Sequence, residues 1–269
     1  MKLIGMILFL LIILIVFQYE KIYAVSSEPI MITISSSMND LIFDGKWTNY
    51  LEWKKSSWNQ LSYDDGMIIH LRTAHYQDFI YVFVDPVRDY TLDKGMDFTT
   101  VCLDGQNNKA KVADKDDFCF TVSLGHNQGG VSQGGSPIAL NGNFQKISNP
   151  EGFIAICSVS DENDRYTTTP HPSYEFRIPL ELIERSPNYG FYLSVYDSDS
   201  KTFYTWPKES HRESLFRVPS PSEWGDIVSP DKSMPEFEWP FLALIPAFLI
   251  VIILTKRLGI HNTQTDRLK

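Results

Sequence analysis

The sequence is poor in cysteine and in clustered basic residues. Its 269 residues include only three cysteines, and no two of them have the C-x-x-C spacing of a zinc site. Lysine and arginine number 24 against 33 aspartates and glutamates, a formal net charge of -9, and no long basic run lies between the hydrophobic ends. Binding to nucleic acid needs clustered positive charge, so this balance argues against such a partner.

The sequence also gives little sign of catalysis. We expect neither a nucleophile elbow nor an H-E-x-x-H zinc site, and no G-x-x-x-x-G-K-[ST] phosphate loop is present. No Asn-x-Ser/Thr sequon is present either, so N-glycosylation is not expected. Carboxylates are plentiful, which leaves a pair of glycosidase acids open. We nevertheless predict that the protein is not an enzyme.

The first residues have the composition of a signal peptide. Lys2 supplies the positive charge, residues 3–17 are apolar except for Gly5, and Ala24 is a small residue at a plausible cleavage position. As a helix the apolar run would span about 22 Å, less than a bilayer core. We predict a signal peptide over residues 1–24, with an uncleaved signal anchor as the alternative.

A second apolar run, residues 239–255, lies near the end of the chain. As a helix it would span about 26 Å, just enough to cross a bilayer. Trp239 fits the membrane interface, and Lys256 and Arg257 mark the cytoplasmic side. We predict a single-pass helix in the cell membrane, an extracellular domain before it and a cytoplasmic tail, 256–269. A buried core helix is the alternative.

The residues before this run carry a short motif. Pro235, Glu236 and Phe237 precede the apolar segment and its basic end. This arrangement resembles the archaeal PEF-type C-terminal sorting signals, which implies processing by an archaeosortase. The sequence departs from that pattern at Glu238, where the best-known version has glycine, and in its long tail. The motif lies in a predicted spacer, 228–238, and a permanent anchor is the alternative.

The extracellular part reads as a series of short strands. The segments are rich in aromatic and β-branched residues and end at Gly, Pro, Asp or Asn. Residues 118–124 alternate, with Phe118, Phe120, Val122 and Leu124 on one face. Eight or more such segments without a long amphipathic helix predict an all-β fold, an antiparallel two-sheet β-sandwich of jelly-roll type. The segments cover residues 67–74, 79–85, 97–105, 117–124, 152–160, 173–182, 189–200 and 201–207.

Two regions are expected to be irregular. Residues 125–145 are rich in glycine and predict a mobile loop, and the segment from Pro219 predicts a spacer leading to the membrane. Cys102 and Cys119 fall on strands that we expect to be neighbours. They are the expected disulfide pair in an oxidising compartment, and buried free thiols are the alternative. The odd count leaves Cys157 unpaired in the first case.

The order of segments resembles the family 9 carbohydrate-binding modules and their DOMON-like relatives. The likeness covers residues 30–227. It rests on the hydrophobic pattern of the segments and on the turn residues that separate them. It implies a β-sandwich that binds ligands and does no chemistry. The matching strings are FDGKWTNYLEW, HLRTAHYQDFIYVFVDP, MDFTTVCLDG, DDFCFTV, YEFRIPLELI and YGFYLSVYDSDS, followed by YTWP.

Aromatic side chains are the natural platforms for a sugar, because pyranose rings present apolar C–H faces. Trp47 and Trp53 lie where the resemblance implies core packing, whereas Trp58, Trp206 and Trp224 lie in polar surroundings and are the predicted ligand-binding residues. Packing under a loop is the alternative for all three. Two departures bear on the sugar site that the resemblance implies. The loop 89–97 carries a tyrosine and no tryptophan, and a cysteine stands near the expected arginine.

Acidic residues surround one predicted hairpin. Asp104, Asp114, Asp116 and Asp117 flank the loop between two strands and offer the hard oxygen ligands that Ca²⁺ prefers. A solvated acidic loop is the alternative, and Asp197 and Asp199 form a fainter case. Haem is a further alternative ligand, since some DOMON-like domains bind it through methionine and histidine or lysine. None of the available residues has a diagnostic spacing: Met67, Met96, His70, His75, His126, His171 and His211.

The sequence therefore predicts an archaeal-type surface protein tethered to the membrane. Its β-sandwich would bind carbohydrate or another cell-envelope polymer. The competing prediction is a structural envelope protein whose sandwich holds no small ligand.

Overall fold

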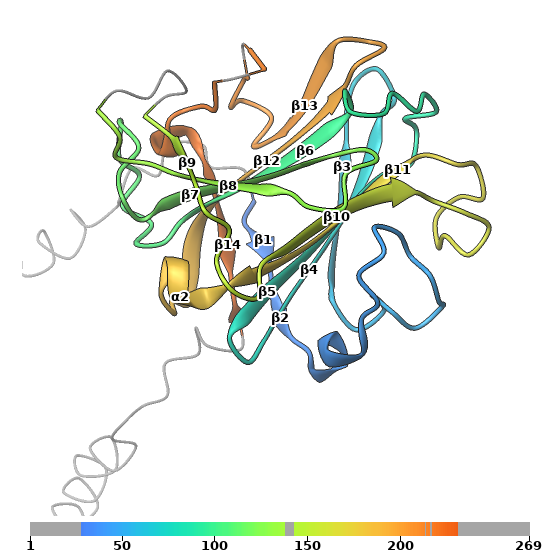
Figure 1. The fold of residues 1–269 in the computed structure, drawn as a ribbon, viewed down its shortest axis with the longest axis horizontal. Helices are drawn as coiled ribbons and strands as arrows, with labels where there is room; N and C mark the ends of the chain where they lie inside the picture. Colours follow the sequence, from blue (N-terminus) through green and yellow to red (C-terminus); the bar gives the residue numbers. More distant parts are fainter. Residues whose placement is uncertain (1–27, 138–142, 213, 216, 231–269) are drawn as a thin grey trace, which may run out of the picture. The chain divides into compact units, whose positions relative to one another are not determined.

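The computed structural model describes residues 28–137, 143–212, 214–215 and 217–230, which form two packed antiparallel sheets with two short parallel pairings (Figure 1). The first sheet, sheet A, has the order β1-β14-β12-β6-β7-β8-β9, and β13 pairs with β12. Its strands are β1 (Ile30–Met31), β6 (Phe98–Asp104), β7 (Asp117–Ser123), β8 (Gly130–Gln133), β9 (Gln145–Ile147), β12 (Asn188–Asp197), β13 (Thr202–Trp206) and β14 (Gly225–Val228).

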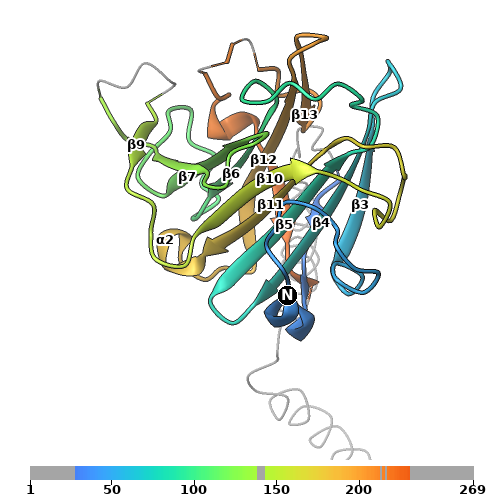
Figure 2. The same cartoon turned by 45° about the vertical axis from the view of Figure 1, so that its right-hand side comes forward.

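The second sheet, sheet B, has the order β10-β11-β5-β4-β2, and β3 pairs with β4. Figure 2 shows β3, β4, β5 and β11 together as one layer of the sandwich. The strands are β2 (Thr33–Ile34), β3 (Ser57–Ser62), β4 (Ile68–Tyr76), β5 (Phe79–Pro86), β10 (Ile154–Val159) and β11 (Pro172–Pro179). This arrangement agrees with the predicted two-sheet β-sandwich.

The core lies between the sheets and follows the alternation of each strand. Phe118, Phe120, Val122 and Leu124 point inward, and so do Met67, Ile69 and Leu71, as predicted. Strand β5 is apolar on both faces because it has a neighbour on each side and a cover on its outer face. Burial of these side chains is the main favourable contribution to folding.

The outer face of sheet B is covered by residues 36–56, which begin with the 3-10 helix η1 (Ser36–Asp40). Trp47 and Trp53 are both fully buried under this cover, as the resemblance implies. Glu175 on β11 accepts hydrogen bonds from the backbone N–H groups of Asp44 and Gly45 and from Trp53 Nε1. Burial raises the pKa of Glu175 to about 8.

Gly45 explains the Asp-Gly pair at the start of the domain. Its φ of +85° lies in the region that favours glycine. A Cβ atom there would also stand 2.5 Å from the backbone nitrogen of Ser158. The cover can approach β10 this closely only with glycine at this position.

Two expectations need correction. The glycine-rich segment 125–145 contains strand β8, which pairs with β7 and with β9. The segment from Pro219, expected to be a spacer, contributes strand β14 between β1 and β12. As expected, helix is confined to short pieces in the described ranges, including the four-residue α2 (Leu180–Ile183).

The chain divides into two units, residues 1–230 and 231–269. The predicted signal peptide, the PEF motif and the apolar run 239–255 all lie outside the described residues. Within the described residues, no helix is long and apolar enough to cross a membrane.

Candidate functional site

A groove of about 310 Å³ opens on the outer face of sheet A. Strand alternation places Phe98 of β6, Thr121 of β7 and Tyr196 of β12 on this face, opposite to the core residues. Ser123 and Ser132 add hydroxyl groups to its wall. The volume falls at the lower end of the range of about 300–1,000 Å³ found for small-molecule sites.

The aromatic part of the groove is built from neighbouring strands. The rings of Phe98 and Tyr196 lie 5.2 Å apart, and Tyr196 also packs on Phe203 of β13 at 4.6 Å. Phe98 and Tyr196 occupy directly opposite positions in the β6–β12 pairing, which brings their rings together. Gly95 and Met96, in the loop before β6, form the adjoining rim.

Arg212 lies over these rings. Its guanidinium carbon is 5.3 Å from the ring of Phe98 and 5.1 Å from the ring of Phe203. Nη1 donates to Thr100 Oγ1 and Ser194 Oγ, at 3.1 and 2.8 Å. Among the described residues, no carboxylate forms an ion pair with Arg212. The groove therefore carries a fixed positive charge beside aromatic rings, a combination suited to a polar ligand with apolar faces.

The three predicted tryptophan platforms have different fates. Trp206 on β13 packs in the main core and is 6% exposed, and Trp224 is 4% exposed and packs against Phe144 and Tyr192 on the outer face of sheet A. Neither ring is available as a surface platform, because apolar neighbours distant in sequence close over both. Trp58 on the edge strand β3 is 52% exposed. It lies on the outer face of sheet B, whereas the groove lies on sheet A.

Cys102 and Cys119 face each other across the β6–β7 pairing and are joined by a disulfide, while Cys157 is a buried free thiol. Both bridged cysteines point to the outer face, and Cys119 lines the groove. The disulfide thus ties together the two strands that form the groove floor.

The predicted acidic hairpin gathers three of its four aspartates. Asp104, Asp116 and Asp117 have carboxylate oxygens within 4.8 Å of one another, whereas Asp114 is outside this group. Asp117 Oδ1 is buried without a hydrogen-bond partner. Burial, with the nearby charge of Asp104, raises the pKa of Asp117 to about 8. A buried, unpartnered carboxylate oxygen among other carboxylates fits a hard cation.

A second acidic cluster lies beside the groove rim. Asp89 and Asp97 come from the loop between β5 and β6, and Asp197 ends β12; their carboxylate oxygens also lie within 4.8 Å of one another. Asp89 Oδ2 is buried without a partner, and burial with two neighbouring charges raises the pKa of Asp89 to about 7. Of these three residues, only Asp197 was considered as a calcium ligand from the sequence, because the three are far apart along the chain.

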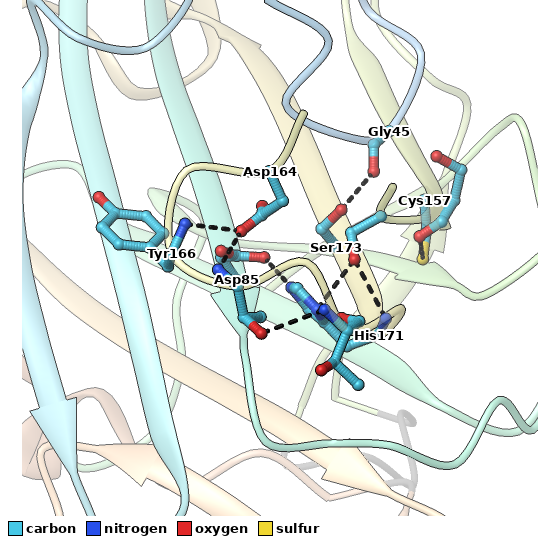
Figure 3. A network of polar contacts seen from close by, with 11 residues as sticks. Gly45, Asp85, Cys157, Asp164, Tyr166, His171 and Ser173 are labelled. Atoms are coloured by element: carbon cyan, nitrogen blue, oxygen red, sulfur yellow. Dashed lines mark hydrogen bonds and ion pairs between the residues drawn. The ribbon is translucent and has the colours of Figure 1, made fainter. Parts of the chain in front are cut away.

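A third polar network, shown in Figure 3, joins Asp85 of β5 with Asp164 and His171, which lie in the loop between β10 and β11. His171 Nε2 lies 2.6 Å from Asp85 Oδ1, and Nδ1 lies 2.8 Å from Ser160 Oγ. Burial alone would lower the pKa of His171, but the hydrogen bond and charge of Asp85 outweigh it, so the pKa is raised.

This Ser-His-Asp set differs from a hydrolase triad. His171 Nδ1 is also 2.8 Å from the carbonyl oxygen of Thr169, which can only accept, so Nδ1 carries a proton and is no base for Ser160. Ser160 is 3% exposed and cannot meet a substrate. The string Gly130–Gly134 has the G-x-S-x-G spacing, but its serine lies on strand β8 and not on a strand-to-helix turn.

Several histidines considered for haem are engaged with protein groups. His75 Nε2 bonds to Ser229, and His70 Nδ1 accepts a hydrogen bond from Trp58. Together with His171, these side chains serve the packing of sheet B.

No family model matches the sequence, and no curated protein matches it. Two structures of a family 9 carbohydrate-binding module from Caldicellulosiruptor kristjanssonii are similar to this chain. The complex with cellotriose is 14% identical, with a TM-score of 0.42, and covers 75% of this chain and 93% of its own. The complex with glucose is 15% identical, with a TM-score of 0.44, and covers 75% and 95%.

Proposed function

We propose that the described domain is a non-catalytic carbohydrate-binding module that holds a glycan in the groove on sheet A. One observation carries this proposal: the groove combines two packed aromatic rings, several hydroxyl groups and the guanidinium of Arg212, with which no described carboxylate forms an ion pair, in about 310 Å³. A pyranose ring has C–H faces that pack on aromatic rings and hydroxyls that need both donors and acceptors.

The two acidic clusters are proposed calcium sites that hold loops in place. Their ligands are carboxylate oxygens only, and each includes a buried oxygen that lacks a partner in the described protein. In the hairpin cluster, Asp104, Asp116 and Asp117 would bind the ion. In the rim cluster, Asp89, Asp97 and Asp197 would bind it and fix the loop that carries Gly95 and Met96.

Display at the cell membrane remains part of the proposal and rests on the sequence. The signal peptide and the apolar run 239–255 would place the domain outside the cell, and the PEF motif would make it a substrate of an archaeosortase. A permanent single-pass anchor is the alternative.

A glycan-binding screen tests the groove. Full-length protein in detergent would be titrated calorimetrically against a panel of oligosaccharides that includes cellotriose and glucose. We expect saturable binding to at least one glycan, and at least tenfold weaker binding by Phe98→Ala. Phe98→Leu, which keeps an apolar side chain without a flat ring, is the matched control and should bind weakly while folding normally.

The competing function is a structural envelope component. It predicts no saturable binding of any glycan by the wild type, with or without calcium. That result would overturn the proposed function, as would glycan binding that is unchanged in Phe98→Ala and Tyr196→Ala.

A further inference from the structure

Trp58 is exceptional among the tryptophans of the described residues because half of its surface is exposed. Its exposed fraction is 52%, whereas the indoles of Trp47, Trp53, Trp206 and Trp224 are at most 6% exposed. It lies on β3, which pairs only with β4 in sheet B. An indole that is half exposed adds less to the core than a buried one, and its ring is accessible to a ligand.

A hydrogen bond from the indole nitrogen holds the ring of Trp58 in one orientation. Its Nε1 donates to His70 Nδ1 at 3.1 Å. His70 lies on the outer side of β4 and is only 7% exposed because Trp58 and Tyr166 pack on it. Burial and then the charge of Arg72 lower the pKa of His70 to about 4, so its Nδ1 remains an acceptor at neutral pH.

Tyr166 also packs near the Trp58 ring. It stacks on His70 at 3.6 Å and is nearly parallel to Trp58, at 6.4 Å and 18°. Its hydroxyl accepts a hydrogen bond of 2.7 Å from Arg72 Nε. The polar edges of both aromatic rings are thus satisfied inside the protein, and the guanidinium of Arg72 lies 5.8 Å from the Trp58 ring, while 52% of Trp58 stays exposed.

The buried network of Figure 3 holds the loop that carries Tyr166. Asp164 Oδ1 accepts from the backbone N–H groups of Tyr166 and Thr167, at 2.8 and 3.0 Å. Asp164 also clusters with Asp85 and His171 beneath the loop. Residues of sheet B thus hold the Tyr166 loop in place, and through it the ring of Trp58, before any ligand binds.

Polar groups continue from Trp58 along the strand. Trp58, Gln60 and Ser62 are all exposed and alternate with the less exposed Ser57, Asn59 and Leu61. Side chains two positions apart share one side of a strand and are roughly 6–7 Å apart. Arg165, next to Tyr166 in the sequence, has its guanidinium carbon 5.2 Å from the exposed ring of Tyr50.

We propose that Trp58, Gln60 and Ser62 form a second glycan-contact face that binds along an extended polysaccharide. This Trp58 face rests on the proposed function of the domain and adds a site on the opposite sheet. The indole stacks on one sugar ring, while the amide and hydroxyl of the strand bind neighbouring hydroxyls. Two sites on opposite sheets would contact separate chains or distant parts of one chain, which raises avidity for polymers over short sugars.

Affinity electrophoresis of the full-length protein in detergent tests this face, with a panel of soluble β-glucan, xylan, mannan and galactan in the gel. For the polysaccharide that retards the wild type, we expect Trp58→Ala to weaken retardation at least fivefold. Trp58→Phe keeps a flat ring and should retain part of the effect. Calorimetric affinity for a di- or trisaccharide in the groove should be unchanged in Trp58→Ala.

The loop network has its own matched pair. Asp164→Ala removes the acceptor for Tyr166 and Thr167 and should weaken polysaccharide retardation, whereas Asp164→Asn keeps an acceptor oxygen and should retain more. Circular dichroism and melting temperature establish that each variant is folded. Loss of retardation in Asp164→Ala with an unchanged melting temperature supports the positioning role.

The outcomes separate this inference from the proposed function. Retardation lost in Phe98→Ala but unchanged in Trp58→Ala overturns the Trp58 face and leaves the groove. Retardation lost in Trp58→Ala but unchanged in Phe98→Ala supports the face and overturns the groove. No retardation of the wild type by any polysaccharide overturns both. If Trp58→Ala instead abolishes self-association detected by analytical ultracentrifugation without affecting retardation, the face is a protein-pairing edge and the inference is wrong.

Discussion

The two outer faces of the sandwich are covered in different ways. On sheet B, residues 36–56 seal the middle of the face with two fully buried indoles, Trp47 and Trp53, and a buried carboxyl, Glu175. On sheet A, the cover includes Trp224 and Val218 over the disulfide but leaves a groove over Phe98 and Thr121. The cover of sheet B forms a second hydrophobic core. The cover of sheet A is incomplete and leaves part of the sheet accessible.

This difference separates stability from binding within one fold. Under the complete cover of sheet B, the aromatic rings pack in the protein interior. On this sheet, the proposed ligand contact lies at the edge strand β3, where Trp58 is exposed. Where the cover is incomplete, outward residues of three central strands are accessible. Substitutions in the two covers should therefore affect different properties.

The largest effect is expected in the complete cover. Trp53→Ala leaves a cavity beside Phe83, on which the indole stacks at 5.3 Å, and removes the hydrogen bond to Glu175. We expect the free energy of unfolding to fall by about 3–5 kcal/mol, measured by urea denaturation. Leu215→Ala, at the groove rim with 39% exposure, is the control and should change stability by less than about 1 kcal/mol. Equal losses would contradict the comparison.

The acidic clusters on and beside sheet A should make the free energy of unfolding fall with rising pH in the absence of metal and rise when calcium is added. Burial raises the pKa of Asp117 to about 8 and of Asp89 to about 7 in the folded state, above the value near 3.8 of an ordinary aspartate. Without metal, the protonated forms stabilise the fold at low pH, and this stability is lost as pH rises through 7 to 8.

We expect the free energy of unfolding in EDTA to fall between pH 5 and pH 8, because the folded state holds these protons to a higher pH than the unfolded chain does. Calcium should restore it, with a larger effect at pH 8, because binding needs the ionised carboxylates. Urea denaturation at both pH values measures this. Asp117→Asn should abolish most of the calcium effect of the hairpin cluster. Stability that rises toward pH 8 in EDTA would contradict the account of these clusters.

The disulfide is expected to have a smaller effect, confined to sheet A. Cys102 and Cys119 are separated by 17 positions, and a loop of this size corresponds to about 3 kcal/mol of denatured-state entropy. The double variant Cys102→Ala/Cys119→Ala should lose about 2–3 kcal/mol and bind glycan more weakly, since Cys119 lines the groove. Cys157→Ala serves as a buried control without a bridge. Unchanged glycan affinity in the double variant would show that the groove floor does not depend on the bridge.

The smallest effect on stability is expected at Trp58. Because its ring is half exposed, Trp58→Ala should lower the free energy of unfolding by less than about 1 kcal/mol, measured by urea denaturation. A loss as large as that of Trp53→Ala would show that Trp58 is a structural residue and would remove the reason for a second binding face.

The sequence predicted the sandwich because each central strand alternates with a period of two, as in residues 118–124. It did not predict the covers, whose apolar residues have no regular spacing. Trp206 and Trp224 have polar neighbours along the chain, so they were expected at the surface, yet both are buried by contacts distant in sequence. Strand β14 was missed for a related reason, since Pro219 and Pro221 precede a short strand that only its pairing with β12 reveals.

The site was predictable only where its residues are adjacent in sequence. Asp104, Asp116 and Asp117 flank one hairpin and could be grouped, whereas Asp89, Asp97 and Asp197 come together only through sheet A and its loops. Arg212 could not be found in advance, because its partners Phe98 and Ser194 are more than ten residues away along the chain. A groove of this kind depends on strand order, which the sequence alone does not supply.

The most direct test of the groove is nuclear magnetic resonance of the full-length, deuterated protein in detergent, titrated with its tightest-binding oligosaccharide. We expect amide shift changes centred on Phe98, Thr121, Ser132 and Tyr196, with little change at Trp53 and its indole. Saturable shift changes that leave these four residues unaffected would contradict a glycan site on the outer face of sheet A.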